Sequence, residues 1–278
     1  MSRPAPTPKS LVLTLLGLTL AAAVAVGLQA RENASSKADL YGYTLADSRG
    51  VGGGSCGYDY IPLPATATTL PLAPGHGKAA EDDLAAVLPL AQPFELYQQP
   101  GKSLVVSGNG YLAAADSLQA EDGSDFSNDC SLPARADNPA ASQNRIYVYH
   151  DDLRPQAGGG VRQAYFPACP RGAASGRREA CTVVEWRGFE RAGPLHSTQP
   201  LQAQAVLYHG SHEIALQYAS VDDSQAAQAT IGLQGFDGRT ARQAGCNTPR
   251  RVASRQAICF FDPRSRPGAS MTGVIAGR

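Results

Sequence analysis

Alternation of apolar and polar residues along the chain predicts a protein built from many short β-strands. In residues 201–219, LQAQAVLYHGSHEIALQYA, apolar residues alternate up to His209, pause at a Gly-Ser pair and resume from His212. Glycine in the first position of a two-residue loop suits a type II′ turn, whose twist matches the strands that it joins. Residues 104–114 have the same form around Asn109 and Gly110. Both stretches therefore predict β-hairpins in an antiparallel sheet.

The same reading extends over most of the chain. The predicted strands are residues 40–46, 66–72, 94–98, 103–107, 111–115, 145–150, 160–166, 181–186, 202–209, 212–219, 227–234 and 257–261. Turn clusters rich in Gly, Pro, Asp and Ser separate them, which is typical of a sandwich or barrel. We expect an all-β fold, an antiparallel β-sandwich of jelly-roll type with about 10–13 strands.

Two segments need separate comment. Residues 79–90 are the best candidate for a helix, but Pro89 limits it, and residues 84–96 also fit an extended edge strand. In residues 181–186, alternation places Val184 and Trp186 on one face and Cys181, Val183 and Glu185 on the other. We expect Trp186 to be a core residue of the sandwich.

The N-terminus predicts export. Arg3 and Lys9 precede an apolar run over residues 11–28, and small residues suited to signal peptidase follow. An uncleaved anchor is the alternative, because a run of this length nearly spans a bilayer. The predicted organisation is a signal peptide over residues 1–30, a flexible linker over 31–38, a single domain over 39–263 and a disordered tail over 264–278. We expect no membrane span after signal cleavage and a secreted or periplasmic location.

Cysteine usage agrees with export. Six cysteines lie beyond the apolar run, at Cys56, Cys130, Cys169, Cys181, Cys246 and Cys259. An even number in an exported chain indicates a disulfide framework. Short separation favours Cys169–Cys181 and Cys246–Cys259, which leaves Cys56–Cys130 by elimination. No CxxC motif occurs, which argues against a zinc site.

Composition narrows the classes of partner. The 24 basic side chains, less Arg3 and Lys9, stand against 24 acidic ones, and no basic stripe or polybasic tail exists. Nucleic acid and anionic membrane are therefore poor partners. Trp186 is the one tryptophan of the chain, so a sugar-binding platform of several tryptophans cannot form.

Two motifs resemble catalytic or metal sites, and we interpret both as structural. Ser55 lies in GGSCG, which satisfies the G-x-S-x-G pattern of a nucleophile elbow, but no helix pattern follows it. His209 and His212 would oppose each other across the predicted turn with Cβ atoms about 5 Å apart, a spacing that suits a shared metal. Glu213 should point to the other face. We interpret this HGSHE stretch as a solvated hairpin tip.

Three acidic segments are candidates for calcium binding or acid–base chemistry. Asp151 and Asp152 follow the apolar strand 145–150, where paired carboxylates bind Ca²⁺ or act as acid and base. The alternative is that they cap a turn by accepting backbone N–H groups. The loop 121–129 and residues 81–83 are the second and third candidates, although Gly123 comes too early for an EF-hand. We assign Asp151 and Asp152 as the candidate metal ligands, and calcium is the one cofactor considered.

The order of the segments carries further information. Along the chain come GYTLADS (42–48), EDD (81–83), LPLAQPFELYQ (88–98), VVSGNGYL (105–112), RIYVYHDDLRPQAGGGV (145–161), CTVVEW (181–186), LQAQAVLYHGSHEIALQY (201–218) and ATIGLQG (229–235). This series resembles the nidogen-like (NIDO-type) extracellular β-domain and its bacterial secreted relatives. His150 is a departure, since relatives often carry tryptophan at this position. The resemblance implies an exported, non-catalytic β-sandwich and supplies no catalytic residues to carry over.

Two functions from different classes follow. The first is a disulfide-stapled module that binds another protein or a cell-envelope glycan. The second is an exported hydrolase that uses acids from Asp151, Asp152 or the loop 121–129. A calcium-stabilised extracellular module is a third. An enzyme requires a nucleophile or base that meets its partner group in a cleft, so convergence of side chains discriminates among them.

Overall fold

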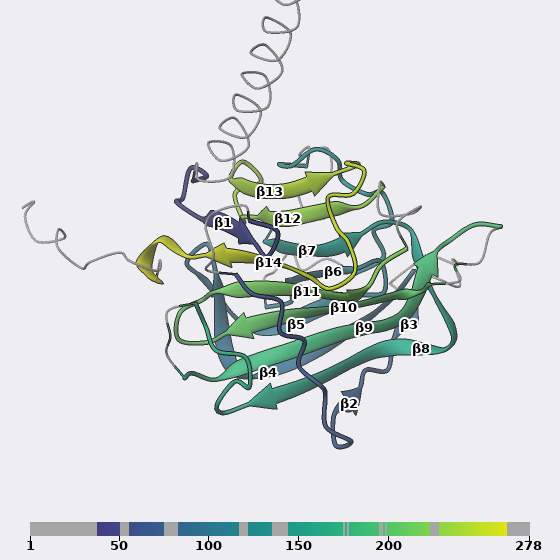
Figure 1. Cartoon of the computed structure of the whole chain (residues 1–278), viewed down its shortest axis with the longest axis horizontal. Coiled ribbons are helices and arrows are strands. Elements are labelled where there is room, and N and C mark those ends of the chain that lie inside the picture. The colour runs from purple at the N-terminus through teal and green to yellow at the C-terminus, as the bar shows by residue number, and fades with distance from the viewer. Residues whose placement is uncertain are drawn as a thin grey trace, which may run out of the picture.

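The fold is a sandwich of two antiparallel β-sheets that lie face to face (Figure 1). The computed structural model describes residues 38–50, 56–74, 83–116, 122–134, 144–174, 176, 178–194, 197, 199–222 and 228–265. The described residues contain fourteen strands, seven in each sheet. The predicted all-β sandwich is confirmed, and two strands of only two residues each extend the expected number.

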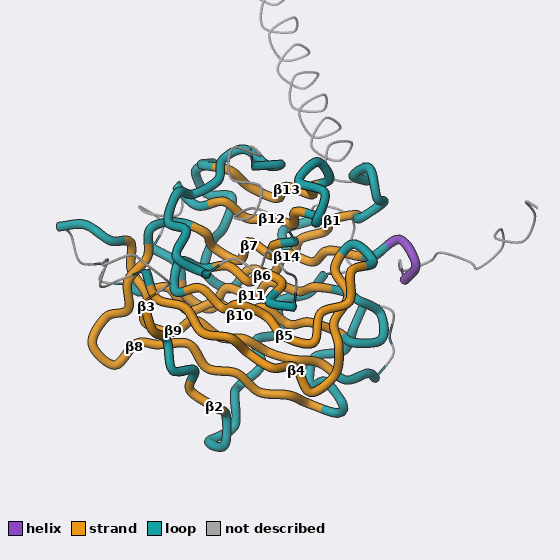
Figure 2. The backbone as a smooth tube through the Cα atoms, turned by 180° about the vertical axis from the view of Figure 1, so that it is seen from behind, coloured by secondary structure: helices purple, strands orange, loops and turns teal. Residues whose placement is uncertain are grey.

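The strands of the first sheet, in spatial order, are β1 (Thr44–Asp47), β14 (Gln256–Phe261), β11 (Ile214–Ser220), β10 (Leu201–Tyr208), β9 (Cys181–Arg191), β8 (Leu153–Phe166) and β2 (Thr68–Thr69). Those of the second are β13 (Ala241–Cys246), β12 (Thr230–Gln234), β7 (Arg145–His150), β6 (Tyr111–Ala114), β5 (Gln99–Ser107), β4 (Leu84–Leu96) and β3 (Ala73–Pro74). Figure 2 shows strands and loops throughout, with one short 3-10 turn, η1 (Pro263–Ser265), after β14. In the described part of the chain, no helix has the length and apolar character that a bilayer crossing requires.

Side chains from both sheets fill the space between them. Val184 and Trp186 of β9 join the central core, whereas Val183 and Glu185 point outward. Trp186 is fully buried, and its indole N–H donates to the carbonyl oxygen of Ser107 at 2.8 Å. Because Ser107 ends β5, this bond joins the two sheets. The prediction that Trp186 is a core residue is confirmed.

Loop segments cover the outer face of each sheet. On the first sheet, residues 56–63 and 166–174 pack over β9, β10, β11 and β14. On the second, the segment 122–134 lies over Tyr111 and Tyr147. Most strands are therefore buried on both sides, which explains why residues 145–150 are an almost continuous apolar run.

The β10–β11 hairpin is confirmed, but the predicted type II′ turn is wrong. The N–H of Tyr208 donates to the carbonyl oxygen of Glu213, so four residues form the loop, and the N–H of His212 donates back to Tyr208. His212 adopts the left-handed conformation with φ 55°. Glu179 stabilises this loop conformation, because one of its carboxylate oxygens accepts hydrogen bonds of 2.6 Å from the backbone N–H groups of Gly210 and Ser211.

The β5–β6 hairpin turns at Gly110, as the sequence predicts. Ser107 pairs with Tyr111, and the N–H of Gly110 donates to the carbonyl oxygen of Ser107 at 3.3 Å. Gly110 has φ 79°, which favours glycine. A Cβ at this position would also overlap the carbonyl oxygen of Tyr149, because β7 passes directly against the turn.

Several segments differ from the predicted strands, and three of them are informative. Residues 84–96 form β4 with Pro89 inside it opposite Ser103, so the extended alternative is confirmed and the helix is wrong over this range. β8 begins at Leu153, earlier than predicted, and a bulge between Pro155 and Gly160 separates its first residues from the predicted part. β13 was not predicted, since ARQAGC has too few apolar residues to mark a strand.

The predicted domain boundaries lie close to the ends of the described residues. The predicted signal peptide and nearly all of the linker lie outside the described residues. At the other end, the guanidinium of Arg264 binds Asp262 at 2.9 Å and Glu95 at 2.9 Å. Arg264 and Ser265, the first residues of the predicted tail, belong to η1. Residues 266–278 lie outside the described residues.

All six cysteines form disulfides, but only one predicted pair is correct. Cys169–Cys181 is confirmed, with a Cα–Cα distance of 5.3 Å. The other pairs are Cys56–Cys259 and Cys130–Cys246, at 5.7 and 5.3 Å. Cys246–Cys259 is wrong because the chain crosses from the second sheet to the first between these residues, and Cys259 points to the outer face. Cys56–Cys130 is wrong because each lies in the covering segment of a different sheet.

Candidate functional site

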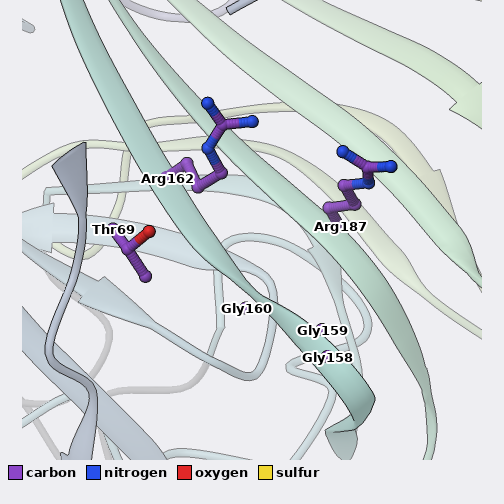
Figure 3. Close-up of a pocket in the computed structure, with 6 residues that line it drawn as sticks. All are labelled: Thr69, Gly158, Gly159, Gly160, Arg162 and Arg187. Carbon is purple, nitrogen blue, oxygen red and sulfur yellow. The ribbon is translucent and has the colours of Figure 1, made fainter. Parts of the chain in front are cut away.

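A wide bulge in β8 opens a small pocket on the outer face of the first sheet (Figure 3). The register of β8 against β9 shifts between Pro155 and Gly160, so several residues of β8 oppose a single residue of β9. Such bulges bend the strand and re-aim its side chains. Gly159 crosses so close to Gly188 that a Cβ on Gly159 would overlap the carbonyl oxygen of Gly188. The chain can follow this path only because glycines occupy it.

Two arginines flank the floor of the pocket. Gly160 lies opposite Arg187 and two residues before Arg162, so strand alternation places all three on one face. A Cβ on Gly160 would meet no atom within 4 Å, so the space between the arginines is open. The pocket has a volume of about 200 Å³, and Thr69 and Gly158 also line it. Figure 3 shows both guanidinium groups extending in the same direction.

The two arginines differ in their partners. Arg162 donates to the carbonyl oxygen of Pro64 at 3.0 Å and lies 3.8 Å from the carboxylate of Glu185. Glu185 is buried and also accepts a hydrogen bond of 2.8 Å from the Tyr60 hydroxyl. The Arg187 side chain is exposed, and within the described ranges no carboxylate reaches ion-pair distance of it. The pocket therefore carries a net positive charge that Arg187 supplies.

This arrangement suits an oxyanion. A guanidinium presents a rigid fork of N–H donors that matches a carboxylate, sulfate or phosphate group. The sequence analysis missed the site, because AGGG resembled an ordinary turn cluster. The available signal was the glycine run followed two positions later by Arg162, since this spacing places Gly160 and Arg162 on one face.

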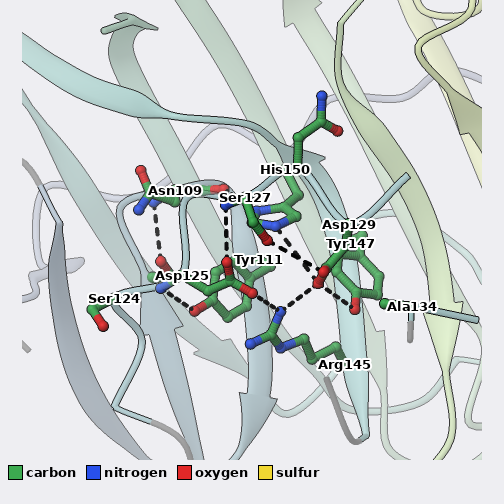
Figure 4. A network of polar contacts seen from close by, with 12 residues as sticks. Asn109, Tyr111, Ser124, Asp125, Ser127, Asp129, Ala134, Arg145, Tyr147 and His150 are labelled. Carbon is green, nitrogen blue, oxygen red and sulfur yellow. Dashed lines mark hydrogen bonds and ion pairs between the residues drawn. The ribbon is translucent and has the colours of Figure 1, made fainter. Parts of the chain in front are cut away.

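A second polar site is an ion-pair network beneath the segment 122–134 (Figure 4). Nη1 of Arg145 lies 2.6 Å from Asp125 and 2.7 Å from Asp129, and the Arg145 side chain is fully buried. Its guanidinium also lies 4.4 Å from the centre of the Tyr111 ring. The Tyr147 hydroxyl donates to Asp129 at 3.0 Å. The acids of the predicted calcium loop thus attach that loop to the sheet.

The network shifts two titrating groups. Burial raises the pKa of Asp125, but the charge of Arg145 and the hydrogen bonds from Arg145 and Ser127 together hold this pKa well below its usual range. Burial lowers the pKa of His150, and Arg145 adds to this effect against the nearby carboxylates of Asp125 and Asp129. Nδ1 of His150 lies 3.0 Å from the carbonyl oxygen of Asn109 and donates to it. The lowered pKa favours the neutral imidazole of His150, whose Nε2 lies 3.8 Å from Asp129.

The same residues show the spacing of a metal site. Asp125, Asp129 and His150 each offer a ligand atom, and these atoms lie within 4.8 Å of one another. However, Arg145 lies between the two carboxylates and occupies the position that a cation would take. The residues do not fit a metal ion while the guanidinium is there.

Asp151 and Asp152, the predicted metal ligands, lie in the turn between β7 and β8. One Asp151 oxygen accepts the N–H of Asp152 at 2.9 Å, and the other lies 3.2 Å from Nε of Arg191. These contacts are those of the turn-capping alternative. Burial raises the pKa of Asp151 to about 6, against the backbone hydrogen bond and Arg191. Within the described residues, the group with metal spacing does not include Asp151 or Asp152.

At the β10–β11 tip, both ring nitrogens of His209 have partners other than a metal, with Nε2 2.9 Å from the Thr182 hydroxyl and Nδ1 3.1 Å from the Pro93 carbonyl oxygen. Phe94 of β4 packs against both rings, with centroid distances of 6.2 Å to His209 and to His212. The predicted solvated tip is wrong, because β4 covers it and His209 is only 8% exposed. Glu213 points to the other face, as predicted, and lies 3.3 Å from Arg171.

The remaining predicted candidates add little to either site. Ser55, Glu81, Asp82 and Glu121 lie outside the described residues. Asp83 is buried and accepts the side-chain N–H of Asn109 at 2.9 Å. Asn109 in turn accepts the N–H of Leu153 at 2.9 Å. Asp83 and Asn109 therefore brace the turn before β8.

The comparisons with known proteins agree with the fold. The sequence matches the family described as NIDO related over residues 55–260. No curated protein and no solved structure matches the chain. Three disulfides together with this match indicate an extracellular or otherwise oxidising environment. The matched range runs from the covering segment at Cys56 through β14, almost the whole described sandwich, and the chain therefore belongs to the NIDO-related family.

Proposed function

We propose that this chain is an exported, non-catalytic β-sandwich module that binds another macromolecule or the cell envelope. The observation that carries the proposal is the open pocket at Gly160, where Arg187 presents charge to solvent above a backbone floor. Membership of the NIDO-related family supports an extracellular module. A rigid sheet that displays an accessible charged group suits recognition of a partner.

Two other charged clusters support the same proposal, because their contacts stabilise the fold. Arg145 ties the segment 122–134 to the second sheet. Arg171 lies 3.3 Å from Glu213 and also donates to the Tyr208 hydroxyl at 2.8 Å. These pairs fix covering segments on the sheets and stiffen the surface that a partner would meet.

An exported hydrolase is the second candidate. The raised pKa of Asp151, about 6, lies in the range of a general acid, and this observation favours it. The contacts of Asp151 favour the binding module instead, since Asp152 and Arg191 engage its two oxygens. Asp151→Asn separates the two functions, because an enzyme that uses this acid loses activity while a binding module keeps its partner.

The test uses the full chain with its disulfides intact, immobilised and exposed to envelope fractions and culture supernatant of the producing cell. We expect retention of an envelope component by the oxidised protein and not by the reduced and alkylated protein. The flow-through is assayed for newly released reducing ends or peptides. Cleavage that Asp151→Asn abolishes would establish the hydrolase, and equal retention by oxidised and reduced protein would contradict a folded binding module.

A further inference from the structure

We propose that the Gly160 pocket binds the carboxylate or sulfate group of an acidic polysaccharide, with Arg187 as the principal donor and Arg162 as the second. This inference rests on the proposed binding function and names the ligand class of its site. It follows from the shape of the pocket, the charge around it and the chemistry of its lining.

The shape excludes a buried small ligand. Pockets that enclose a drug-sized molecule occupy about 300–1,000 Å³, whereas this one has about 200 Å³. It has room for one ionic group and not for a whole ligand. The rest of the ligand must therefore lie along the outer face of the sheet, as an extended polymer would.

The charge selects an anion. Arg162 is balanced in part by Glu185 at 3.8 Å, and its Nη2 is held by the carbonyl oxygen of Pro64. Arg187 stands directly across the strand pair from Gly160, where an open floor replaces a side chain. One guanidinium that no carboxylate of the described residues compensates, beside an open floor, suits one oxyanion at a time. A polymer with repeated anionic groups gains affinity by rebinding at such a site.

The lining favours a glycan over an acidic peptide. Among the described residues, the pocket is lined by Thr69, Gly158, Gly159, Gly160, Arg162 and Arg187, and none of these has an apolar side chain. Peptide recognition relies on apolar anchors or on pockets for alternate side chains. A hydroxyl, glycine backbone groups and guanidinium donors instead match the hydroxyl and carboxylate groups of an acidic sugar.

The experiment measures binding of the full chain to polygalacturonate and to dextran sulfate, with neutral dextran and poly-L-glutamate as comparisons. Arg187→Gln removes the principal donor, and Gly160→Val fills the open floor between the arginines. Arg239→Gln is the matched control, because it removes the same charge from an exposed turn of the other sheet. Melting midpoints confirm that each variant is folded.

We expect Arg187→Gln and Gly160→Val each to weaken binding to at least one acidic polysaccharide about tenfold, with about twofold or less for Arg239→Gln. The polymer that loses affinity distinguishes carboxylate from sulfate. Equal affinities for Arg187→Gln and Arg239→Gln would overturn the site. Tighter, Arg187-dependent binding of poly-L-glutamate would overturn the glycan assignment.

The outcomes also separate this inference from the proposed function. If Arg187→Gln still retains the envelope component in the capture experiment, the chain is a binding module that uses another surface, and only the pocket assignment fails. If the unmodified chain retains nothing, the proposed function fails, whatever the polysaccharides show.

Discussion

The turn at Asn109 and Gly110 shows how much of this structure depends on single residues. Gly110 has a positive φ and lies directly against β7. The backbone carbonyl oxygen of Asn109 accepts a hydrogen bond from Nδ1 of His150. Local sequence predicts the turn, because Asn-Gly is a strong hairpin signal. It does not predict the contacts of Asn109, which involve residues on β7 and before β4.

Gly110→Ala tests the two requirements at this turn. We expect a loss of about 3–4 kcal/mol of unfolding free energy, since the methyl group adds a clash to the strain of a positive φ. Gly238→Ala is the matched control, because Gly238 has φ 61° and open space around its Cβ. The control should lose about 1 kcal/mol in urea unfolding. Equal losses of unfolding free energy in the two variants would show that β7 moves to accommodate the added methyl group.

Asp151 should make stability depend on pH. Its pKa is about 6 in the fold, above the ordinary value of 3.8, so the folded state holds the proton more tightly. Stability is then greatest below the ordinary pKa and falls as pH rises through about 4 to 6. We expect a loss of about 1–3 kcal/mol over this range, because burial disfavours the charged carboxylate in the folded state. Asp151→Asn should remove this slope in unfolding measured across that range.

His150 should act in the opposite direction. Its pKa is lowered by burial, so the unfolded chain takes up the proton first as the solution is acidified. Stability is full above the ordinary pKa of about 6.5 and falls below it. His150→Gln, which keeps a donor for Asn109, should remove this acid-side loss. If His150→Gln lost as much stability on acidification as the unmodified protein, His150 would not be the group responsible.

At the scale of elements, the sequence predicts strands better than it predicts their neighbours. Most strands lie where alternation placed them, because burial of one face produces that pattern. β13 was not predicted, since its residues are mostly small or polar. The four-residue loop after β10 was not predicted either, because its conformation depends on Glu179, which is distant in sequence. Two of the three disulfides were predicted with the wrong partners for a similar reason, because a chain crossing between the sheets leaves no local signal in the sequence.

The disulfides should differ in how much they contribute to the free energy of unfolding. In the chain-entropy model, closing the 116-residue separation of Cys130–Cys246 stabilises by about 4–5 kcal/mol, against about 3 kcal/mol for the 12-residue separation of Cys169–Cys181. Removal of Cys130–Cys246 also releases the neighbouring Asp129. We expect the double Ser variant of this pair to lose more unfolding free energy than that of Cys169–Cys181. The reverse order would contradict the structural importance of the segment 122–134.

At the scale of the whole molecule, the fold class was predictable and the candidate site was not. Many short strands indicated a β-sandwich, an even set of cysteines indicated an oxidising environment, and the order of motifs indicated the family. The pocket arises from a bulge that aligns Gly160 with Arg187 of another strand. Strand register sets this alignment, and sequence alone does not reveal register across a bulge.

Metal dependence is a property of the whole fold and can be tested directly. Because Arg145 occupies the cation position between Asp125 and Asp129, chelator and added calcium should each shift the melting midpoint by less than about 1 °C. Arg145→Ala should cost about 3–5 kcal/mol, since it leaves buried carboxylates without a counter-charge. Calcium should partly restore the midpoint of that variant. A lower midpoint of the unmodified protein in chelator would contradict this account.

The covering segments on the outer faces have a consequence for sequence change. In an uncovered sandwich, every second position of a strand faces water and tolerates substitution. Here the inward Val184 and the outward Val183 are both fully buried, as are the inward Leu207 and the outward Val206. A saturation scan of β9 and β10 should therefore find intolerance at consecutive positions, without the two-residue rhythm that usually marks a strand in mutational data.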